Sequence, residues 1–580
     1  MNPIQVDINR IPQALRHLLP LLRPFRARLF TLSLCALATA LLRTLDPLLR
    51  QRLIDNGVLG GDIRIVIGIT LLILGLFALI QLSEMIQFFC YNYINKLLPF
   101  KLLHRALRHL MRLPVSFFKD SNSNKIIENI EYDVASISKI SDPIFVASLV
   151  QGLCMIGGVV GLTLINWKLT VLVLSIVPVK IAINSYYTKK RIKVFDSALK
   201  LHAVFSEWIG ETVQGILTVK LWRLLRLKMS ELTRLRRKMI KNEYEMAGTE
   251  QKNNVASGTV DELLTGVLYI LGAIFIFSGQ LTLGGLFSFI SYSQLVVSSI
   301  SFLTRIKFYF TPILPSLKRY LDFMAGDTEA GGSLSLPEGA PRFEFKNVTL
   351  SYNERENALM QVSFEIKPNE KIAVVGANGS GKSSLINLLL QLYEPSQGEI
   401  AYCGTDIREI KLEQYRDLFS LVEQKVFLFN ATVRDNINLM RRIPDDKIMN
   451  AAMTLGAADF IDSLPDGLDT VVGVDGMKLS GGQRQKLAAL RAWVKPHEIL
   501  VLDEASNNLD VESEQILNEL LVRKNESKIL LVITHRADIL CEMDKILVME
   551  KGRLVGQGTY QELINSCPAF QQCINPSGNL

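Results

Sequence analysis

The chain has 580 residues and a mass of 65.1 kDa, which is too long for one compact domain and predicts at least two. Hydrophobic residues make up 49%, charged residues 21%, and mean hydropathy is +0.24, which excludes a disordered or fibrous chain and disfavours a fully soluble enzyme. The net charge of +8 is unevenly divided: residues 1–330 carry 38 Lys and Arg against 22 Asp and Glu, and residues 331–580 carry 26 against 34. A basic and apolar first half favours a membrane with anionic lipid as its partner, and argues against nucleic acid.

The seven cysteines form no pattern of ligands. None stands in a CxxC pair and their number is odd, which argues against both a disulfide framework and a zinc site. They are Cys35, Cys90, Cys154, Cys403, Cys541, Cys567 and Cys573. We therefore expect the second half of the chain in a reducing cytoplasm.

Six apolar segments in the first half are long enough to cross a bilayer, which takes about 20 mostly apolar residues. They are Leu29–Leu49, Ile65–Phe89, Phe145–Ile165, Leu169–Tyr187, Leu263–Ser278 and Leu283–Leu303. No residue between Leu263 and Thr304 is charged, so this stretch predicts two helices with a turn near Gly279–Gly285. The alternative is a set of buried helices in a soluble domain, and runs of this length with so few charges disfavour it.

Lys and Arg predict the orientation, because cytoplasmic segments of membrane proteins are enriched in them. The N-terminal segment and the segments after the second and fourth spans are basic, and all three fall on one side if six helices alternate. We therefore expect a multi-pass protein of the bacterial inner membrane with both termini in the cytoplasm. Pro12–Arg28 mixes Leu with Arg and predicts an interfacial helix, and no cleavable signal pattern is present. The two long inner segments have helical spacing and predict helices that continue the spans into the cytoplasm.

The composition changes at Gly326–Pro341, a small, polar and proline-broken stretch. It predicts a linker of residues 326–341 between a membrane domain of residues 1–325 and a second domain of residues 342–580. In the second domain, the apolar strand Lys371–Val375 precedes GANGSGKS at residues 376–383, which fits the phosphate-loop pattern G-x-x-x-x-G-K-[ST]. Its glycines allow tight turns in which successive backbone N–H groups point at phosphate oxygens. Lys382 is expected to reach the β- and γ-phosphates, and Ser383 to bind Mg²⁺.

A second apolar strand, Ile499–Leu502, ends in Asp503 and Glu504. An apolar strand that ends in Asp is the second motif of many nucleotide sites, where the carboxylate holds Mg²⁺. Glu504 is then placed beside the γ-phosphate, where it can orient or deprotonate the attacking water. This motif alone is weak, and its pairing with the phosphate loop makes it strong.

The sequence LSGGQ at residues 479–483 stands between these two motifs. With it, residues 342–580 resemble the nucleotide-binding domain of the ATP-binding cassette (ABC) transporters, whose signature this is. Six spans followed by one cassette resemble a half-transporter of the exporter type, so the resemblance covers nearly the whole chain. It implies an α-helical polytopic membrane domain with six transmembrane helices, followed by an α/β phosphate-loop domain that hydrolyses ATP.

The resemblance also assigns roles to single residues. Tyr352 is similar to the aromatic residue that stacks on adenine, Gln424 to the glutamine that contacts Mg²⁺ and the membrane domain, and His535 to the histidine that contacts the γ-phosphate. It implies that Glu504, His535 and Lys382 are catalytic, and that Ser383, Gln424 and Asp503 hold Mg²⁺. The ATP-binding residues it implies are Tyr352, Gly376, Ala377, Asn378, Gly379, Ser380, Gly381, Lys382, Ser383, Ser384, Gln424, Ser480, Gly481, Gly482, Gln483 and Asp510. Since each ATP in this family lies between one phosphate loop and the partner's LSGGQ, the resemblance further implies a homodimer.

Two short segments depart from the family pattern. Members usually read S-A-L-D after the catalytic glutamate, and this chain reads S-N-N-L-D, so that Asn507 and Asn508 make the surroundings of Asp510 more polar. Members also carry a glutamate in a G-E-x-G-like turn before LSGGQ, where this chain has Val474 and Asp475. That turn is associated with signalling between cassette and membrane domain, so the departure concerns this communication and leaves ATP chemistry intact.

The cargo has to be inferred from polar residues inside the spans, which are costly there and either line a cavity or pair with each other. Lys180 lies 11 residues into its span, near the midplane, and either lines the cavity or forms a structural ion pair. Arg43 and Asp46 are three residues apart on one helix face and can pair with each other. The predicted cavity residues are Lys180, Asn184, Tyr292, Gln294, Arg43 and Asp46. Such a lining suits a polar or amphipathic cargo.

As a whole, the chain resembles half-transporters that secrete antibacterial lasso peptides of the microcin type and thereby protect their producer. This resemblance predicts ATP-driven export of such a peptide by alternating access, although no motif carries the choice of cargo. No peptidase domain precedes the spans, which disfavours leader cleavage during export. A lipid flippase or multidrug exporter is the alternative within transport. An ATP-binding membrane regulator is the alternative from another class, and Glu504 and His535 argue against it. Membrane lipid is an expected partner, and the need for an outer-membrane export partner stays open.

Overall fold

The computed structural model describes residues 20, 23–119, 123–329, 331–353, 356–439, 441–504, 519, 522 and 527–574. The chain divides into two compact units. We call Met1–Met111 together with Asn122–Gly326 the membrane unit, and Arg112–Ser121 together with Asp327–Leu580 the cassette. The interfacial helix predicted at Pro12–Arg28 falls mostly outside the described residues, and its end forms the short helix η2 (Arg23–Phe25).

The membrane unit contains six helices that are long and apolar enough to cross a membrane, which confirms the six predicted spans. The helices that carry them are α2 (Arg26–Arg52), α3 (Ile63–Leu110), α6 (Pro143–Ile165), α7 (Trp167–Gln214), α9 (Leu225–Phe277) and α10 (Leu283–Met324). Shorter helices connect them, namely η3 (Leu53–Val58), α5 (Ser123–Ser138), η4 (Lys139–Ser141) and α8 (Ile216–Leu221). The tight turn between α6 and α7 is a single residue, Asn166, whose side chain accepts hydrogen bonds from the backbone of Lys168 and Leu169 and so caps α7.

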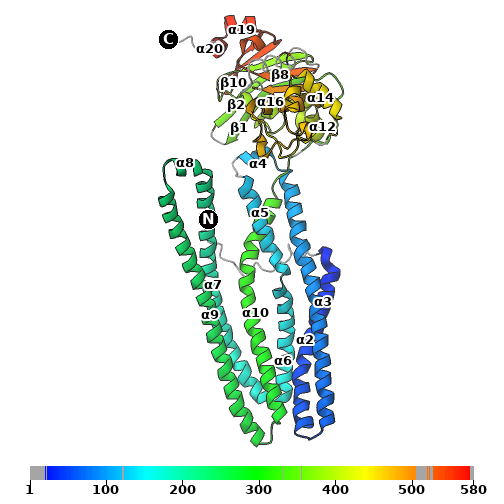
Figure 1. Cartoon of the computed structure of the whole chain (residues 1–580), viewed down its shortest axis with the longest axis vertical. Coiled ribbons are helices and arrows are strands. Elements are labelled where there is room, and N and C mark those ends of the chain that lie inside the picture. The colour runs from blue at the N-terminus through cyan, green and yellow to red at the C-terminus, as the bar shows by residue number, and fades with distance from the viewer. Residues whose placement is uncertain are drawn as a thin grey trace. The chain divides into compact units, whose positions relative to one another are not determined.

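Several of these helices are much longer than a membrane requires. Helices α3 and α7 have 48 residues each and α9 has 53, so each rises by about 70 to 80 Å, against a hydrocarbon core of about 30 Å. Helices α7 and α9 run side by side in opposite directions and are joined through α8 at one end (Figure 1). The spans therefore continue as helices well beyond a membrane.

Small residues allow α6 and α10 to pack closely. A Cβ atom on Gly161 would lie 2.6 Å from the ring of Tyr292, and one on Gly158 would lie 2.7 Å from Val296, so both contacts require glycine. Close approach of this kind is what holds helices together in lipid, where apolar burial supplies little driving force. The Tyr292 ring fills the space over Gly161, and its hydroxyl donates to the backbone oxygen of Thr44 in α2 at 2.5 Å.

The cassette contains two sheets. An antiparallel sheet has the strand order β2-β1-β4-β5, and a mainly parallel sheet has the order β10-β9-β3-β8-β7-β6. The first sheet comprises β1 (Phe343–Asn353), β2 (Glu356–Ile366), β4 (Gln397–Tyr402) and β5 (Thr405–Asp406). The second comprises β3 (Glu370–Val375), β6 (Phe419–Val422), β7 (Ile499–Asp503), β8 (Ile529–Ile533), β9 (Lys545–Glu550) and β10 (Arg553–Gly558). Only β10 runs antiparallel to its neighbour in this second sheet.

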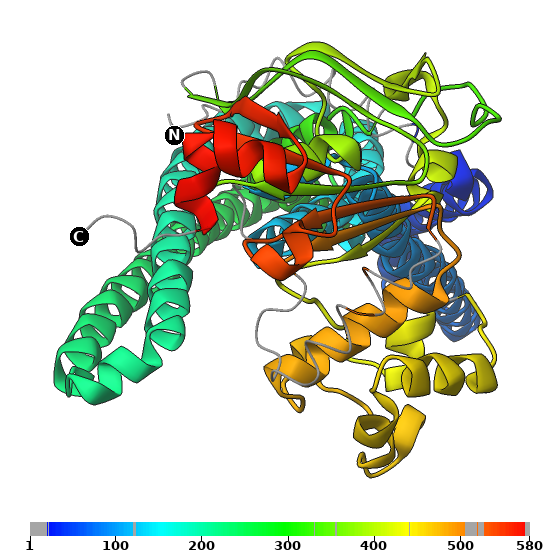
Figure 2. The same ribbon diagram turned by 90° about the horizontal axis from the view of Figure 1, so that it is seen from above.

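Helices cover both faces of the parallel sheet. In β7, Ile499 and Val501 enter one apolar cluster and Leu500 and Leu502 enter the other, as expected for a strand buried on both faces. The cassette helices are α4 (Val115–Lys119), α11 (Lys382–Leu389), α12 (Leu412–Asp417), α13 (Val433–Asn438), α14 (Asp445–Thr454), α15 (Ala458–Asp462), α16 (Gly481–Val494), α18 (Ala537–Leu540), α19 (Tyr560–Ser566) and α20 (Pro568–Ile574). The yellow and orange helices of residues 433–494 gather on one side of the strands (Figure 2). The predicted fold class, six membrane helices followed by an α/β phosphate-loop domain, is confirmed.

Candidate functional site

The predicted phosphate loop connects β3 to α11. Its backbone requires glycine at two positions. Gly381 has φ of 107°, and a Cβ atom there would lie 2.8 Å from the Leu359 side chain. A Cβ atom on Gly376 would lie 2.2 Å from the backbone oxygen of Met549. Because no other residue fits both places, these glycines let the loop wrap closely before the helix begins.

The polar groups of this loop fit a phosphate. Lys382 is 7% exposed, and its ammonium donates to the backbone oxygens of Gly376 at 2.7 Å and Ala377 at 3.1 Å. The hydroxyl of Ser380 is buried and has no hydrogen-bond partner among the described residues. A buried donor without a partner costs free energy, and a phosphate oxygen would relieve that cost. Asn378, Gly379 and Ser383 are exposed, so the rim of the loop is open to a ligand.

The predicted adenine platform is held by α11. The hydroxyl of Tyr352 donates to the hydroxyl of Ser384 at 3.1 Å and accepts from the amide of Asn387 at 3.2 Å. The Tyr352 ring meets the Tyr393 ring edge to face, with centroids 4.9 Å apart. The helix that follows the phosphate loop therefore also sets the ring's position. Sequence reasoning missed Asn387 and Tyr393, since neither belongs to a motif.

The carboxylates of Asp503, a predicted Mg²⁺ ligand, and Glu504, the predicted catalytic base, lie at the end of β7. Asp503 is its last residue, and Glu504 follows with φ of 46°. The side-chain amide of Gln424, which follows β6, donates to the Glu504 carboxylate at 2.5 Å. Neighbouring parallel strands end at one edge of a sheet, and this brings Gln424 to Glu504 across 80 residues of sequence.

Electrostatic effects link these groups to the phosphate loop and to His535, which follows β8. Burial raises the pKa of Asp503 and the charge of Glu504 raises it further, whereas the Lys382 ammonium lowers it. Burial lowers the pKa of His535, and Lys382 lowers it further, whereas Glu504 raises it. The structure thus brings Lys382, Asp503, Glu504, Gln424 and His535 together, and a mainly neutral His535 at neutral pH can accept or donate a hydrogen bond.

The LSGGQ segment begins α16. Ser480 caps the helix: its hydroxyl accepts from the backbone N–H of Gln483 at 3.2 Å, and the Gln483 side chain accepts from the backbone N–H of Ser480 at 2.9 Å. Ser480 is exposed, and Gly481 and Gly482 are half-buried. No hydrogen bond or ion pair among the described residues joins this segment to the phosphate loop. Within one chain, then, the structure does not unite the two halves of the predicted ATP site.

Helix α16 nevertheless forms hydrogen bonds with the segment that carries Gln424. The amide of Gln485 donates to the backbone oxygen of Gln424 at 3.2 Å, and Arg491 donates to the backbone oxygens of Asn436 at 2.9 Å and Phe427 at 3.2 Å. Burial lowers the pKa of Arg491, and the charge of Glu423 raises it. Hydrogen bonds therefore join the signature helix to the glutamine segment.

The two departures from the family pattern differ in what can be described. In the turn before LSGGQ, Val474 is 60% exposed and Asp475 adopts φ of 51°, so an apolar side chain stands on the surface there. Asn507, Asn508 and Asp510 lie outside the described residues.

The predicted cavity residues of the membrane unit take several positions. Lys180 is 1% exposed and its ammonium pairs with the carboxylate of Asp261 at 2.5 Å, which corresponds to the structural ion pair rather than to an open cavity position. Asn184 and Tyr292 are also buried, and Gln294 is exposed. Sequence reasoning missed Asp261, because it stands two residues before the uncharged stretch that marked the fifth span.

Arg43 and Asp46 do not pair with each other. Arg43 of α2 pairs with Glu84 of α3 at 2.6 Å, and Asp46 pairs with Arg50 one turn along α2 at 2.7 Å. The suggested Arg43–Asp46 pair is therefore wrong, because Arg50 binds the Asp46 carboxylate and α3 supplies the acid for Arg43. Buried hydrogen bonds among Thr39, Ser83 and Gln87 lie in the same α2–α3 contact.

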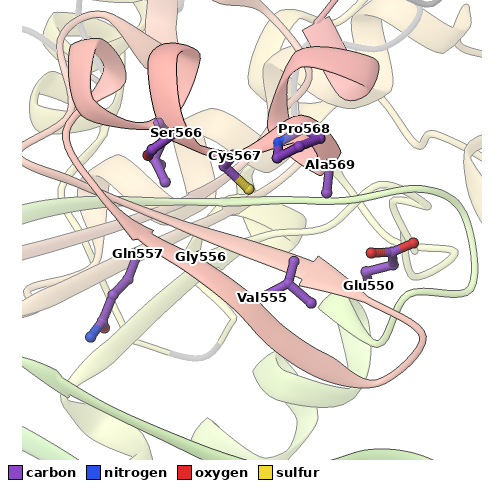
Figure 3. A pocket seen from close by; sticks show the side chains of 9 residues that line it. Glu550, Val555, Gly556, Gln557, Ser566, Cys567, Pro568 and Ala569 are labelled. Atoms are coloured by element: carbon purple, nitrogen blue, oxygen red, sulfur yellow. The ribbon is translucent and has the colours of Figure 1, made fainter.

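A separate pocket of about 380 Å³ lies at the far end of the cassette sequence (Figure 3). Residues of β10 and of the segment from α19 to α20 form most of its wall. They include Val555, Gly556, Gln557, Leu563, Ser566, Cys567, Pro568 and Ala569, with Glu550 from β9. None of the predicted ATP-site residues lines this pocket, so it is distinct from the nucleotide site.

Comparison with known proteins agrees with this architecture. Residues 29–300 match the family described as ABC transporter transmembrane region, and residues 359–507 match the family described as ABC transporter. The ATP-dependent lipid A-core flippase of Thiobacillus denitrificans is 31% identical over 93% of this chain and 94% of its own length. That of Haemophilus ducreyi is 28% identical over 98% of both chains.

A solved structure is similar across the whole fold. It is a bacterial Atm1-family ABC exporter with ATP bound, which matches with a TM-score of 0.81 and 22% identity over 96% of this chain and 99% of that one. At this identity the likeness concerns the fold. The match to the ABC transporter family is what supports the predicted use of ATP and Mg²⁺. The chain therefore belongs to the ABC transporter family, as a half-transporter of the exporter type whose membrane domain is fused to an ATP-hydrolysing cassette.

Proposed function

We propose that two copies of this chain form an exporter of the bacterial inner membrane that uses ATP to move an amphipathic cargo out of the cytoplasm. One observation carries the proposal: each cassette has one phosphate loop with its carboxylates and one LSGGQ segment with Ser480 exposed, and no hydrogen bond or ion pair among the described residues joins the two. A second copy would supply the missing half of each ATP site. Six apolar helices in the same chain supply the membrane passage.

The residues of the cassette fit ATP hydrolysis. Lys382 and the loop backbone would bind the phosphates, and Ser383, Gln424 and Asp503 are the residues proposed to hold Mg²⁺. When bound, Mg²⁺ neutralises charge on the β- and γ-phosphates. Glu504 would accept a proton from the attacking water, and the amide of Gln424 orients its carboxylate by the 2.5 Å hydrogen bond. His535 would contact the γ-phosphate from the end of β8.

Alternating access follows if ATP binds the closed cassette pair more tightly than the open one, because a ligand shifts a conformational equilibrium only by its differential affinity. The cassettes would then close on ATP and separate after hydrolysis. We further propose that both termini lie in the cytoplasm with the cassettes.

A lipid is the first candidate cargo. The relatives that match over nearly the whole chain bear the name lipid A-core flippase. Similarity over whole chains covers the spans as well as the cassette, and the spans are where a cargo is recognised. A lipid flippase is therefore the function that these relatives favour.

A microcin-type peptide is the second candidate cargo, and the charges of the membrane unit favour it. Lys180, Arg43 and Arg191 each face an acid, namely Asp261, Glu84 and Glu250. A phosphorylated headgroup would have to compete with these acids for its basic partners. Within the apolar span of α10, the exposed polar residues include Gln294 and Ser298, which suit the amides of a peptide. Export of such a peptide would give secretion and self-immunity.

One experiment separates the two cargoes. The purified protein is placed in liposomes with the cassettes outward, and two readouts are taken on the same preparation: ATP-driven uptake of a labelled lasso peptide, and ATP-driven movement of a fluorescent lipid A analogue between leaflets. Glu504→Gln is the control without turnover. Peptide uptake by the wild type alone would establish peptide export, and lipid movement alone would establish a flippase. ATP hydrolysis that neither cargo changes, with neither transported, would contradict both and favour a regulator.

A further inference from the structure

Helices α7 and α9 share a polar seam. Lys180 pairs with Asp261 at 2.5 Å, and Arg191 pairs with Glu250 at 3.5 Å. In both pairs the two residue numbers add up to the same total, which means that the antiparallel helices keep one register between the two pairs. The two helices lie side by side in Figure 1. This register places Ser257 opposite Asn184. We call Lys180, Asn184, Asn253, Ser257 and Asp261 the seam.

In both ion pairs between α7 and α9, the base is buried and the acid is exposed. The basic side chains are buried, with Lys180 1% and Arg191 11% exposed, whereas the acidic partners are open, with Asp261 41% and Glu250 44% exposed. The accessible end of each pair is therefore a carboxylate. The Asp261 carboxylate can accept further hydrogen bonds beyond the one from Lys180.

The depth of Asp261 shows what its open side can face. It lies 16 residues before the end of α9 at Phe277, a rise of about 24 Å, which is less than the hydrocarbon core of about 30 Å. A carboxylate open to hydrocarbon at that depth would be very costly, so charged residues there face a polar cavity or a partner. Asp261 is accordingly placed to meet a polar molecule within the membrane.

Unsatisfied amides lie on the same two helices, α7 and α9. Asn184 is wholly buried one turn along α7 from Lys180, and neither its amide nitrogen nor its amide oxygen has a hydrogen-bond partner among the described residues. The amide oxygen of Asn253 is likewise buried without a partner. Buried polar groups in a membrane protein are normally satisfied, because no water competes there. The seam therefore has amide atoms of Asn184 and Asn253 that lack hydrogen-bond partners among the described residues.

We propose that the seam binds a nitrogen donor group of the cargo, such as an ammonium, a guanidinium or an amide, and rejects phosphate and carboxylate. The inference rests on the proposed function as an exporter and names the chemical class that its membrane unit takes. Asp261 would accept from the donor with the oxygen that does not hold Lys180. The amide oxygen of Asn184, one turn along α7 from Lys180, would accept from it as α7 and α9 part. Lys180 holds the Asp261 carboxylate in place through its hydrogen bond, and an anionic group would meet that carboxylate first.

The test is equilibrium binding of three matched probes to the full-length protein in nanodiscs without ATP. The probes are monodansylcadaverine, which carries a primary amine, and its N-acetyl and N-succinyl derivatives, which replace the amine by an amide and an anion. The dansyl fluorescence reports binding in each case. We expect the amine to bind the wild type most tightly and the succinyl derivative at least about tenfold more weakly, since a hydrogen bond to a charged group is worth about that factor.

Variants then locate the binding. Asp261→Asn is expected to weaken amine binding about tenfold. The matched control is Glu243→Gln, which removes an exposed carboxylate of α9 that lies 34 residues before Phe277, outside the hydrocarbon core, and should leave the affinity unchanged. Because Asp261→Asn leaves the Lys180 ammonium buried without its partner, Asn184→Leu provides a second test. It removes both unsatisfied amide atoms, leaves the ion pair intact, and should weaken amine binding severalfold without lowering the thermal stability.

Equal affinity for all three probes would overturn the proposal. So would amine binding that neither Asp261→Asn nor Asn184→Leu weakens. Neither result would touch the proposed export function, which is measured separately by ATP-driven transport. Conversely, selective amine binding at the seam in a protein that transports neither peptide nor lipid would support the seam and contradict both proposed cargoes.

Discussion

The cassette and the membrane unit carry their functional residues in different ways. In the cassette, the phosphate-loop residues stand together in sequence, and the remaining groups follow strands that end at one edge of a sheet. In the membrane unit, the residues that meet are far apart in sequence: Lys180 and Asp261 are separated by 81 positions and Arg43 and Glu84 by 41. The first arrangement follows from local backbone geometry, and the second depends on the register between long helices, which no short motif encodes.

Substitution of Glu504 is expected to have the largest effect and tests the cassette side of this comparison. Glu504→Gln should still bind ATP, because the loop and Lys382 are unchanged. Its turnover should fall by a factor of about 10² to 10⁴, as expected for loss of a general base. Phosphate release gives the turnover, and displacement of a fluorescent ATP analogue gives the binding.

Glu413→Gln serves as the matched control, because Glu413 is an exposed carboxylate on α12 outside the site. It should hydrolyse ATP at the wild-type rate. If Glu504→Gln kept most of the activity, the role assigned to Glu504 would be lost, and the edge of the sheet would no longer identify the catalytic group.

Lys180→Met probes the membrane side and is expected to have the next largest effect. The substitution leaves Asp261 without its partner, but Asp261 is 41% exposed, so we expect a loss of about 1 to 3 kcal/mol in the free energy of unfolding. Transport should change while basal ATP hydrolysis is largely kept, because the hydrolytic groups lie in the cassette. Thermal unfolding in detergent and ATPase rates measure the two effects.

The double variant Lys180→Met with Asp261→Leu is the informative companion. If the pair is structural, removing both charges should restore much of the stability that Lys180→Met loses. Unchanged stability in the single variant would mean that the ion pair contributes nothing to the α7–α9 contact.

Much of the cassette could be predicted from sequence because its signals are local. Glycines at fixed positions before Lys382, and an apolar strand ending in Asp503, each report a backbone conformation that few other residues allow. The six spans were equally predictable, since length and apolarity alone determine a membrane helix. The side-chain contacts of Tyr352 were not predictable, because Asn387 reaches it only once β1 and α11 pack together.

Pairing within the membrane unit was predicted less well for a physical reason. Spacing along one helix suggested an Arg43–Asp46 pair, whereas α3 places Glu84 within reach of Arg43. Asp261 was overlooked because the predicted fifth span was limited to the uncharged stretch that begins at Leu263, two residues later. A charged residue at the edge of an apolar stretch is a usable signal when an oppositely charged residue on another span lies at a matching depth.

Asn387→Ala sharpens the comparison within the cassette and should have a smaller effect. It removes the amide that donates to the Tyr352 hydroxyl at 3.2 Å, while the Ser384 contact and the Tyr393 ring remain. A hydrogen bond is worth about 1 kcal/mol, so the KM for ATP should rise about fivefold with kcat nearly unchanged. Steady-state kinetics provide the test. A fall in kcat at constant KM would show that Asn387 acts elsewhere than on the adenine platform.

The smallest expected effect concerns the Arg43–Glu84 pair. It tests whether the α2–α3 face that carries this pair is open to water or covered by protein. The side chains are 39% and 36% exposed, and a charge pair open to water contributes about 0.2 to 1 kcal/mol. A double-mutant cycle with Arg43→Gln and Glu84→Gln, read by thermal unfolding, should give a coupling in that range if this face lines a hydrated passage. A parallel cycle on Asp46 and Arg50, paired one turn apart on α2, provides the comparison. A coupling well above 1 kcal/mol at Arg43 and Glu84 alone would mean that water is excluded from them. The face would then have to be covered by protein, since an ion pair cannot stand open to hydrocarbon.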